Sequence, residues 1–331
     1  MHLDQLVLFI MKEGQVTFSE FSKSTFKNWL KEIKQKNPHL DFEKELKWRD
    51  PLGIELDPFY DASNTTAATY ITHFFSSQPY PQWKLLHKIE VKDDKTANRE
   101  ALDALNNGCE GIIFDVEHHA PNPDILYDQI QAAHCSIFFT GSRTKDLDDF
   151  FNHYRSLEAS AFEGGADNWV SGHAQFSYTI DATHYRTLKE WSSLVLQIID
   201  CLKSKDQSVT VHISHGSHFY YDLTRVRSLR FMVCALCRAE KIPFSTDRFR
   251  IHSSPIKRKG LAEGLISNSA TGLSLTLGAI HYLSFELDAE ASADGQRWSR
   301  NVGNLLREEA QLTFEQDPIA GAHFLDFYCH Q

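Results

Sequence analysis

Two short apolar runs, Gly111-Ile112-Ile113-Phe114-Asp115-Val116 and Cys135-Ser136-Ile137-Phe138-Phe139-Thr140, decide the fold class. Both are bulky on either face of an extended chain, as expected for strands of a parallel sheet that is covered on both sides. From Trp83 onward such runs alternate with longer stretches whose apolar residues recur at helical spacing, most clearly at 185–203 and 219–240. The alternation predicts eight strands, at 84–91, 111–116, 135–140, 175–181, 208–214, 248–254, 281–287 and 321–328.

Eight strands with helices between them, spread over about 250 residues, match an α/β chain folded as a (β/α)8 barrel of the TIM type. A doubly wound sheet is less favoured because no glycine-rich phosphate loop follows the first strand. The bulky strands also favour a barrel filled by side chains. Because only 329–331 follow the expected eighth strand, the eighth helix is predicted to be missing. The apolar flank that this leaves would need cover from the N-terminal arm or from another chain.

The chain of 331 residues is predicted to consist of an N-terminal arm, 1–82, and a barrel, 83–331. Its 34 basic and 44 acidic residues give a formal charge of −10 without blocks of like charge, which argues against nucleic-acid binding. Six cysteines without a framework of spacings favour reduced thiols. The sequence shows no basic flank before its first apolar run and no stretch near the roughly 20 apolar residues of a membrane span. We therefore expect a cytoplasmic protein with no membrane partner.

Histidines and carboxylates gather where the predicted strands end, at the mouth where barrels carry their chemistry. A small ligand or a metal ion could bind there, but no helical metal-ligand spacing supports a metal and we assign none. Cys234 and Cys237 form a C-x-x-C pair that continues an apolar helix stripe, so buried thiols are a better interpretation than a redox motif. A serine hydrolase is not supported because no G-x-S-x-G elbow is present. The candidates at the mouth are Asp115, His118, Asp181, His215 and His218.

Several segments resemble, in order and spacing, the methylmalonyl-CoA mutase family. Their similarity extends from about residue 18 to the end of the chain, and the family's fold is the barrel expected above. The segments are Leu46-Lys47-Trp48-Arg49 with Gly53-Ile54 and Pro58-Phe59-Tyr60, then 97–108, 180–185, 249–252, Ser299-Arg300-Asn301 with 305–310, and Asp317-Pro318-Ile319-Ala320-Gly321.

The resemblance implies a relative of adenosylcobalamin-dependent acyl-CoA mutases, which are isomerases. This chain departs from the catalytic members, because the cobalamin motif D-x-H-x-x-G and the segment with the catalytic tyrosine are both absent. After the fourth expected strand, His184, Tyr185 and Arg186 stand where the family continues from tyrosine-histidine into small residues, and His252 keeps a motif position. We regard these four as candidates for a vestigial site and assign no catalytic or cofactor-binding residue.

The resemblance favours the small, non-catalytic subunit of the family. It implies a heterodimer with a catalytic large subunit, in which adenosylcobalamin is bound by the partner and none by this chain alone. Two alternatives stay open. The chain could be a diverged barrel that binds or converts a small ligand or metal at its histidine-rich mouth, or a fragment whose cobalamin module is encoded next to it.

Overall fold

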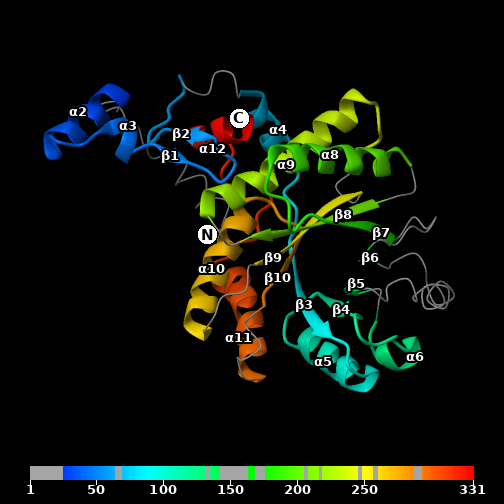
Figure 1. The fold of residues 1–331 in the computed structure, drawn as a ribbon. Coiled ribbons are helices and arrows are strands. Elements are labelled where there is room, and N and C mark those ends of the chain that lie inside the picture. Colours follow the sequence, from blue (N-terminus) through cyan, green and yellow to red (C-terminus); the bar gives the residue numbers. More distant parts are fainter. Residues whose placement is uncertain are drawn as a thin grey trace, which may run out of the picture.

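The structure, a computed structural model, describes residues 25–63, 69–131, 134–141, 163–167, 176–204, 208–215, 218–244, 248–255, 260–286 and 293–331. Parallel strands close into a barrel in the order β10-β3-β4-β5-β6-β7-β8-β9 (Figure 1). The strands are β3 (Lys84–Glu90), β4 (Gly111–Asp115), β5 (Ser136–Thr140), β6 (Glu163–Asp167), β7 (Phe176–Asp181), β8 (Ser208–His215), β9 (Phe249–Pro255) and β10 (Tyr282–Ser284). The TIM-type α/β barrel is confirmed.

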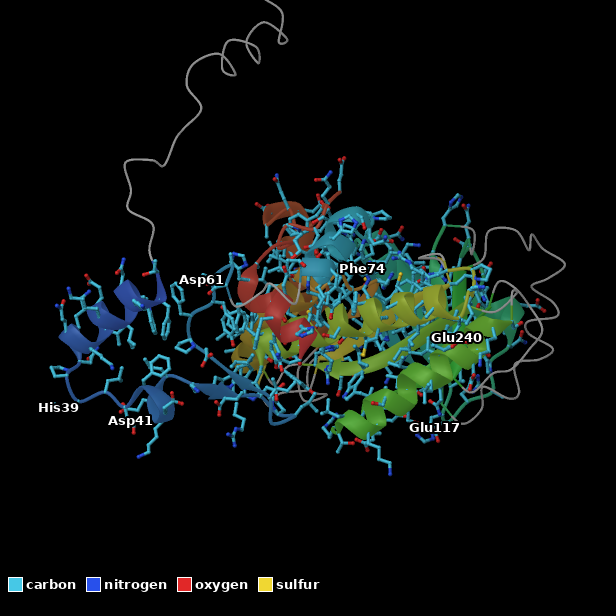
Figure 2. The ribbon with its side chains drawn as sticks, turned by 90° about the horizontal axis from the view of Figure 1, so that it is seen from above. His39, Asp41, Asp61, Phe74, Glu117 and Glu240 are labelled. Atoms are coloured by element: carbon cyan, nitrogen blue, oxygen red, sulfur yellow. The ribbon has the colours of Figure 1, made fainter. Side chains whose placement is uncertain are left out.

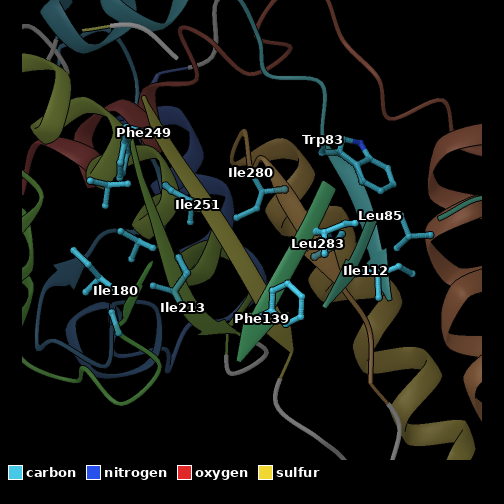
Figure 3. Close-up of a cluster of buried hydrophobic side chains, with 14 of the residues drawn as sticks. Trp83, Leu85, Ile112, Phe139, Ile180, Ile213, Phe249, Ile251, Ile280 and Leu283 are labelled. Atoms are coloured by element: carbon cyan, nitrogen blue, oxygen red, sulfur yellow. The ribbon is translucent and has the colours of Figure 1, made fainter. Parts of the chain in front are cut away.

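Helices cover the outside of the barrel and bury the outward side chains of its strands. Because side chains alternate along a strand, one set of positions faces the helices and the other faces the barrel axis. The outward set includes Leu85, Ile112, Phe139, Ile213, Ile251 and Leu283, which join the main buried core (Figure 3). The covering helices are α5 (Asp94–Asn106), α6 (Pro123–Leu126), α8 (Leu188–Lys203), α9 (Phe219–Ala239), α10 (Leu261–Leu277) and α11 (Ala293–Asn304), which continues into the π-helical turn η4 (Leu305–Glu309).

The prediction of a strand at 321–328 is wrong, because this segment forms the helix α12 (His323–His330). Its apolar residues fit a helix, since Leu325 and Tyr328 are buried three positions apart on one face. The eighth strand of the barrel is β10, and α11 follows it. The expectation of a missing eighth helix is therefore also wrong.

The additional strand is β6, which the sequence analysis did not predict. Its sequence, Glu-Gly-Gly-Ala-Asp, lacks the branched and aromatic residues that favour strands. It pairs in parallel with β5 on one side and β7 on the other. Closure of the barrel therefore depends on a strand whose three central residues, Gly-Gly-Ala, are small.

The N-terminal segment packs against the barrel's helices through a hairpin and one helix. The hairpin strands β1 (Trp48–Arg49) and β2 (Glu55–Leu56) form a buried cluster with Tyr221 of α9 and Tyr328 of α12. Helix α4 (Thr69–Ser77) buries Ile71 and Phe75, and Arg227 of α9 lies 3.8 Å from the centroid of the Phe75 ring. The predicted boundary between an arm of 1–82 and a barrel of 83–331 stays a prediction.

Helices α2 (Phe26–Lys36) and α3 (Phe42–Glu45) lie to one side of the barrel, with His39 and Asp41 between them (Figure 2). The two helices pack against each other through aromatic rings. The ring centroids of Phe26 and Phe42, for example, are 5.9 Å apart. No residue of α2 or α3 is buried. These two helices therefore contribute little to the core.

All six cysteines are free thiols. Within the described part of the chain, no helix is both long and apolar enough to span a membrane.

Candidate functional site

Among the described residues, two neighbouring layers of side chains inside the barrel form the candidate site, and the first of these is apolar. It consists of Leu86, Ile113, Phe138 and Tyr282, each no more than 2% exposed. They come from the adjacent strands β3, β4, β5 and β10, and the rings of Phe138 and Tyr282 meet edge to face with centroids 5.0 Å apart. Side chains therefore fill this part of the barrel interior, as the bulky strands predict.

The second layer is polar and begins two residues further along the same strands. Lys88 of β3 lies there, and its Nζ is 3.2 Å from Oδ2 of Asp115 on β4. The same Nζ is 3.9 Å from Oε1 of Glu286, just beyond β10. Two carboxylates thus surround one ammonium group at the mouth of the barrel.

Two imidazoles lie on the neighbouring strands of this polar layer. The rings of His212 on β8 and His252 on β9 are 4.3 Å apart between centroids. His252 Nε2 is hydrogen-bonded to Oγ of Ser284 at 2.9 Å. Among the described residues, His212 Nε2 and His252 Nδ1 are buried without a hydrogen-bond partner. Each is free to donate to or accept from a small ligand, depending on its tautomer.

Burial keeps both imidazoles uncharged at neutral pH. It lowers the pKa of His212 to about 4, assisted by the positive charge of Lys88 and opposed by Asp181. Burial, with His212 and Lys88 nearby, also holds the pKa of His252 well below its usual value. The mouth therefore combines a paired ammonium group with two neutral imidazoles, which suits binding of a polar ligand better than nucleophilic chemistry.

The predicted mouth residues separate into two groups. Asp115 lies in the polar layer, and Asp181 is exposed at the end of β7, where its Oδ1 accepts hydrogen bonds from Thr183. His118 is exposed in the loop after β4. These three lie at or beyond the C-terminal ends of the strands, as expected.

The placement of His215 in the mouth is wrong. Strand β8 continues through this residue, so the alternation of side chains places His215 on the outer face with Val209, Val211 and Ile213. There it is fully buried and its Nδ1 is hydrogen-bonded to Oγ of Ser253.

His218 also contacts a different part of the molecule. It is the residue before α9, and its exposed side chain lies with its ring centroid 5.8 Å from that of Trp48 in the β1–β2 hairpin. The hairpin, which the sequence analysis assigned to the arm, is thus the neighbour of this histidine.

The vestigial-site candidates His184, Tyr185 and Arg186 lie in the loop that begins α8. Tyr185 packs on Trp191, and the backbone N–H of Arg186 donates to Oε2 of Glu190 at 2.8 Å. Thr187 and Glu190 complete a capping box at the start of the helix. His184 is exposed, so only His252 of the four candidates lies inside the barrel.

Sequence reasoning missed Lys88 and Glu286. Lys88 follows Lys84 and Leu86 at intervals of two, so a charged residue on the inward face of β3 could have been found from the alternation alone. Among the described residues, no three or more His, Cys, Asp or Glu side chains are arranged to hold a metal ion.

Comparison with curated proteins gives a distant relative. No protein-family model matches the chain. The methylmalonyl-CoA mutase small subunit of Porphyromonas gingivalis (strain ATCC BAA-308 / W83) is 22% identical over 382 aligned positions, which cover 95% of this chain and 62% of that protein. This chain thus spans less than two thirds of its relative's length.

Among solved structures, Yersinia pestis DHPS with a pterine-sulfa conjugate has a TM-score of 0.38 and 10% identity, covering 67% of this chain and 94% of that one. Dihydropteroate synthase from Anaplasma phagocytophilum has a TM-score of 0.35 and 12% identity, covering 68% and 99%. The barrel itself is shown by the pairing of its strands. The sequence match with the small subunit supports a distant relationship to the methylmalonyl-CoA mutase family.

Proposed function

We propose that this chain is a non-catalytic barrel subunit that associates with the catalytic chain of an acyl-CoA mutase. The observation that carries the proposal is the apolar layer of Leu86, Ile113, Phe138 and Tyr282, which fills barrel space that a long acyl substrate would need. The loop of His184 to Arg186 supports it, since its polar groups cap α8. The distant match with a mutase small subunit agrees with both.

In this proposal adenosylcobalamin belongs to the partner chain. The sequence offers no D-x-H-x-x-G segment from which a histidine could ligate the cobalt. The heterodimer would act in the cytoplasm, where the six free thiols of this chain would stay reduced. The division into an arm of 1–82 and a barrel of 83–331 is part of the same proposal.

Co-expression with the large mutase subunit of the same genome tests the association. We expect the two chains to co-elute in size-exclusion chromatography, while an unrelated barrel protein of similar size elutes apart from the large subunit. The eluted complex should retain adenosylcobalamin absorbance after desalting, and this chain alone should retain none. A chain that elutes as a monomer and leaves the large subunit's thermal stability unchanged would refute the proposal.

The adjacent reading frame provides a second check. A cobalamin-binding module encoded there would mean that this chain is one half of a split mutase and takes part in catalysis directly.

A second candidate function is ligand binding at the mouth, favoured by the unpartnered ring nitrogens of His212 and His252 in the described chain. Thermal-shift measurements with Zn²⁺, Ni²⁺ and inorganic phosphate would detect it. We expect a rise in melting temperature for the natural chain and none for His212→Gln. If no probe raises the melting temperature, or if the variant responds equally, the mouth is not a binding site.

A further inference from the structure

A cavity of about 250 Å³ lies outside the barrel, between α8, α9, α12 and the β1–β2 hairpin. None of the polar-layer residues of the mouth lines it. Most of its wall is apolar, and part of that wall is open to water, since Leu188 is 55% exposed and Met232 37% exposed. The apolar lining is Leu52, Ile54, Leu188, Leu229, Phe231 and Met232.

Three polar side chains in the wall are almost fully buried, and each has an unpartnered atom. The atoms are Trp191 Nε1, Thr224 Oγ1 and Arg225 Nε, and none has a hydrogen-bond partner within the described chain. Exposed fractions are 6% for Trp191 and 3% for Thr224, and 8% for the side chain of Arg225. All three atoms can donate a hydrogen bond, and two of them can only donate.

Asp50 and Tyr70 of the same wall already have hydrogen-bond partners. Asp50 accepts from the hydroxyl of Tyr328 at 2.7 Å and from the backbone N–H groups of Leu52 and Ile54. Tyr70 is hydrogen-bonded to His330 at 2.8 Å. The cavity therefore has surplus donors and no matching surplus of acceptors among these groups.

Arg225 adds a positive charge to these donors, part of which the buried carboxylate of Asp222 offsets. Its guanidinium lies between the rings of Trp191 and Tyr221, with its central carbon 5.1 and 5.0 Å from their centroids, and Nη2 donates to the carbonyl of Ser214. The carboxylate of Asp222 approaches Nη2 at 3.6 Å, which leaves Nε unused. A ligand with acceptor oxygens and negative charge would fit this end of the cavity.

We propose that this cavity binds a small monocarboxylate with an unbranched apolar tail. The carboxylate would accept from the three donors, and the tail would lie against Leu229 and Met232. A dry apolar cavity of about 150 Å³ holds one benzene molecule, so this larger space admits roughly ten non-hydrogen atoms, the size of octanoate. The lining of this site shares no residue with the polar layer of the mouth, and the site does not depend on the proposed subunit function.

Titration of the full chain with octanoate, followed through the ¹⁵N-labelled indole groups, tests the site. We expect the Trp191 indole signal, assigned with Trp191→Phe, to shift saturably at millimolar octanoate or below. Thr224→Val removes one donor at constant shape and should weaken binding roughly fivefold. Thr313→Val, at an exposed position outside the cavity, should leave binding unchanged.

Two control measurements test the charge of the ligand and the space in the cavity. Octylamine has the same tail and the opposite charge, so it should not saturate the site. Met232→Trp places a larger ring at the rim of the cavity and should abolish the shift. The proposal is overturned if octanoate does not shift the Trp191 signal. The side chains of a partner chain would then be the other candidate occupant of the cavity. Equal binding of octanoate to Thr224→Val, or of octylamine to the natural chain, would also overturn the proposal.

Discussion

Acidification should destabilise this protein through the imidazoles buried in and around the barrel, and His212 allows the effect to be calculated. The folded state holds the pKa of His212 at about 4, against 6.5 as its ordinary value. Below pH 6.5 the unfolded chain therefore binds a proton that the folded chain does not. Stability contributed by the neutral ring is complete above pH 6.5 and is lost as the pH falls toward 4.

The size of the loss follows from these two pKa values. Integrating proton uptake from pH 7.5 to pH 5.0 gives about 2 kcal/mol of unfolding free energy for His212 alone. Burial also holds the pKa values of His215, His252 and His281 well below the ordinary value, so these rings add to the loss in the same direction.

Urea unfolding at 25 °C, at pH 7.5 and at pH 5.0, measures the effect for the natural chain and for His212→Gln. Glutamine does not titrate, so the variant should lose about 2 kcal/mol less than the natural chain over this interval. His39→Gln is the control, because it makes the same substitution at an exposed position. Near-UV circular dichroism at pH 7.5 shows whether the variant keeps its packing. Equal losses in the natural chain and in a folded His212→Gln would refute the argument that burial holds this ring neutral.

Three further changes test the packing of the barrel and of its surrounding helices. Phe138→Ala removes one ring from the apolar layer and should lower the unfolding free energy, measured with urea, by about 3–5 kcal/mol. Phe26→Ala is the control and should lower it far less, because the ring of Phe26 is 36% exposed. Asp317→Asn removes the partner of the fully buried Arg227, 2.6 Å away, and should cost about 3–5 kcal/mol by the same measurement, an expectation that a loss below 1 kcal/mol would contradict. Thr187→Ala breaks the capping box of α8 and should cost about 1 kcal/mol, visible as a lower melting temperature; an unchanged value would mean that Glu190 caps the helix alone.

The sequence pattern was informative where strands are bulky and failed where they are not. The strands predicted at 111–116 and 135–140 agree with β4 and β5 to within one residue at each end. Strand β6 escaped notice because Gly-Gly-Ala carries no apolar signal, and its place in the sheet comes from pairing with both neighbours. The segment 321–328 was assigned to the wrong class because a short apolar run does not by itself distinguish a strand from a buried helix.

The candidate site was predicted in part, and strand alternation explains the difference. Asp115 was expected at the mouth and lies in its polar layer, and the vestigial-site candidate His252 lies in the same layer. His215 lies three residues after His212, an odd number, and therefore faces the helices. The alternation along β3 indicates the inward position of Lys88, but not its pairing with Asp115 and Glu286, because these residues meet it only after the barrel closes. Pairing across strands of distant sequence is a property of the closed fold and leaves no local signal.

The hydrogen bond between Tyr328 and Asp50 joins residues 278 positions apart. During synthesis, the β1–β2 hairpin leaves the ribosome long before its partners on α12 have been made. Until then, Leu56 and its aromatic neighbours have only part of their final cover. Nascent chains of this protein therefore carry an exposed apolar surface until α12 has been made, and this is the stage at which a chaperone would be most useful.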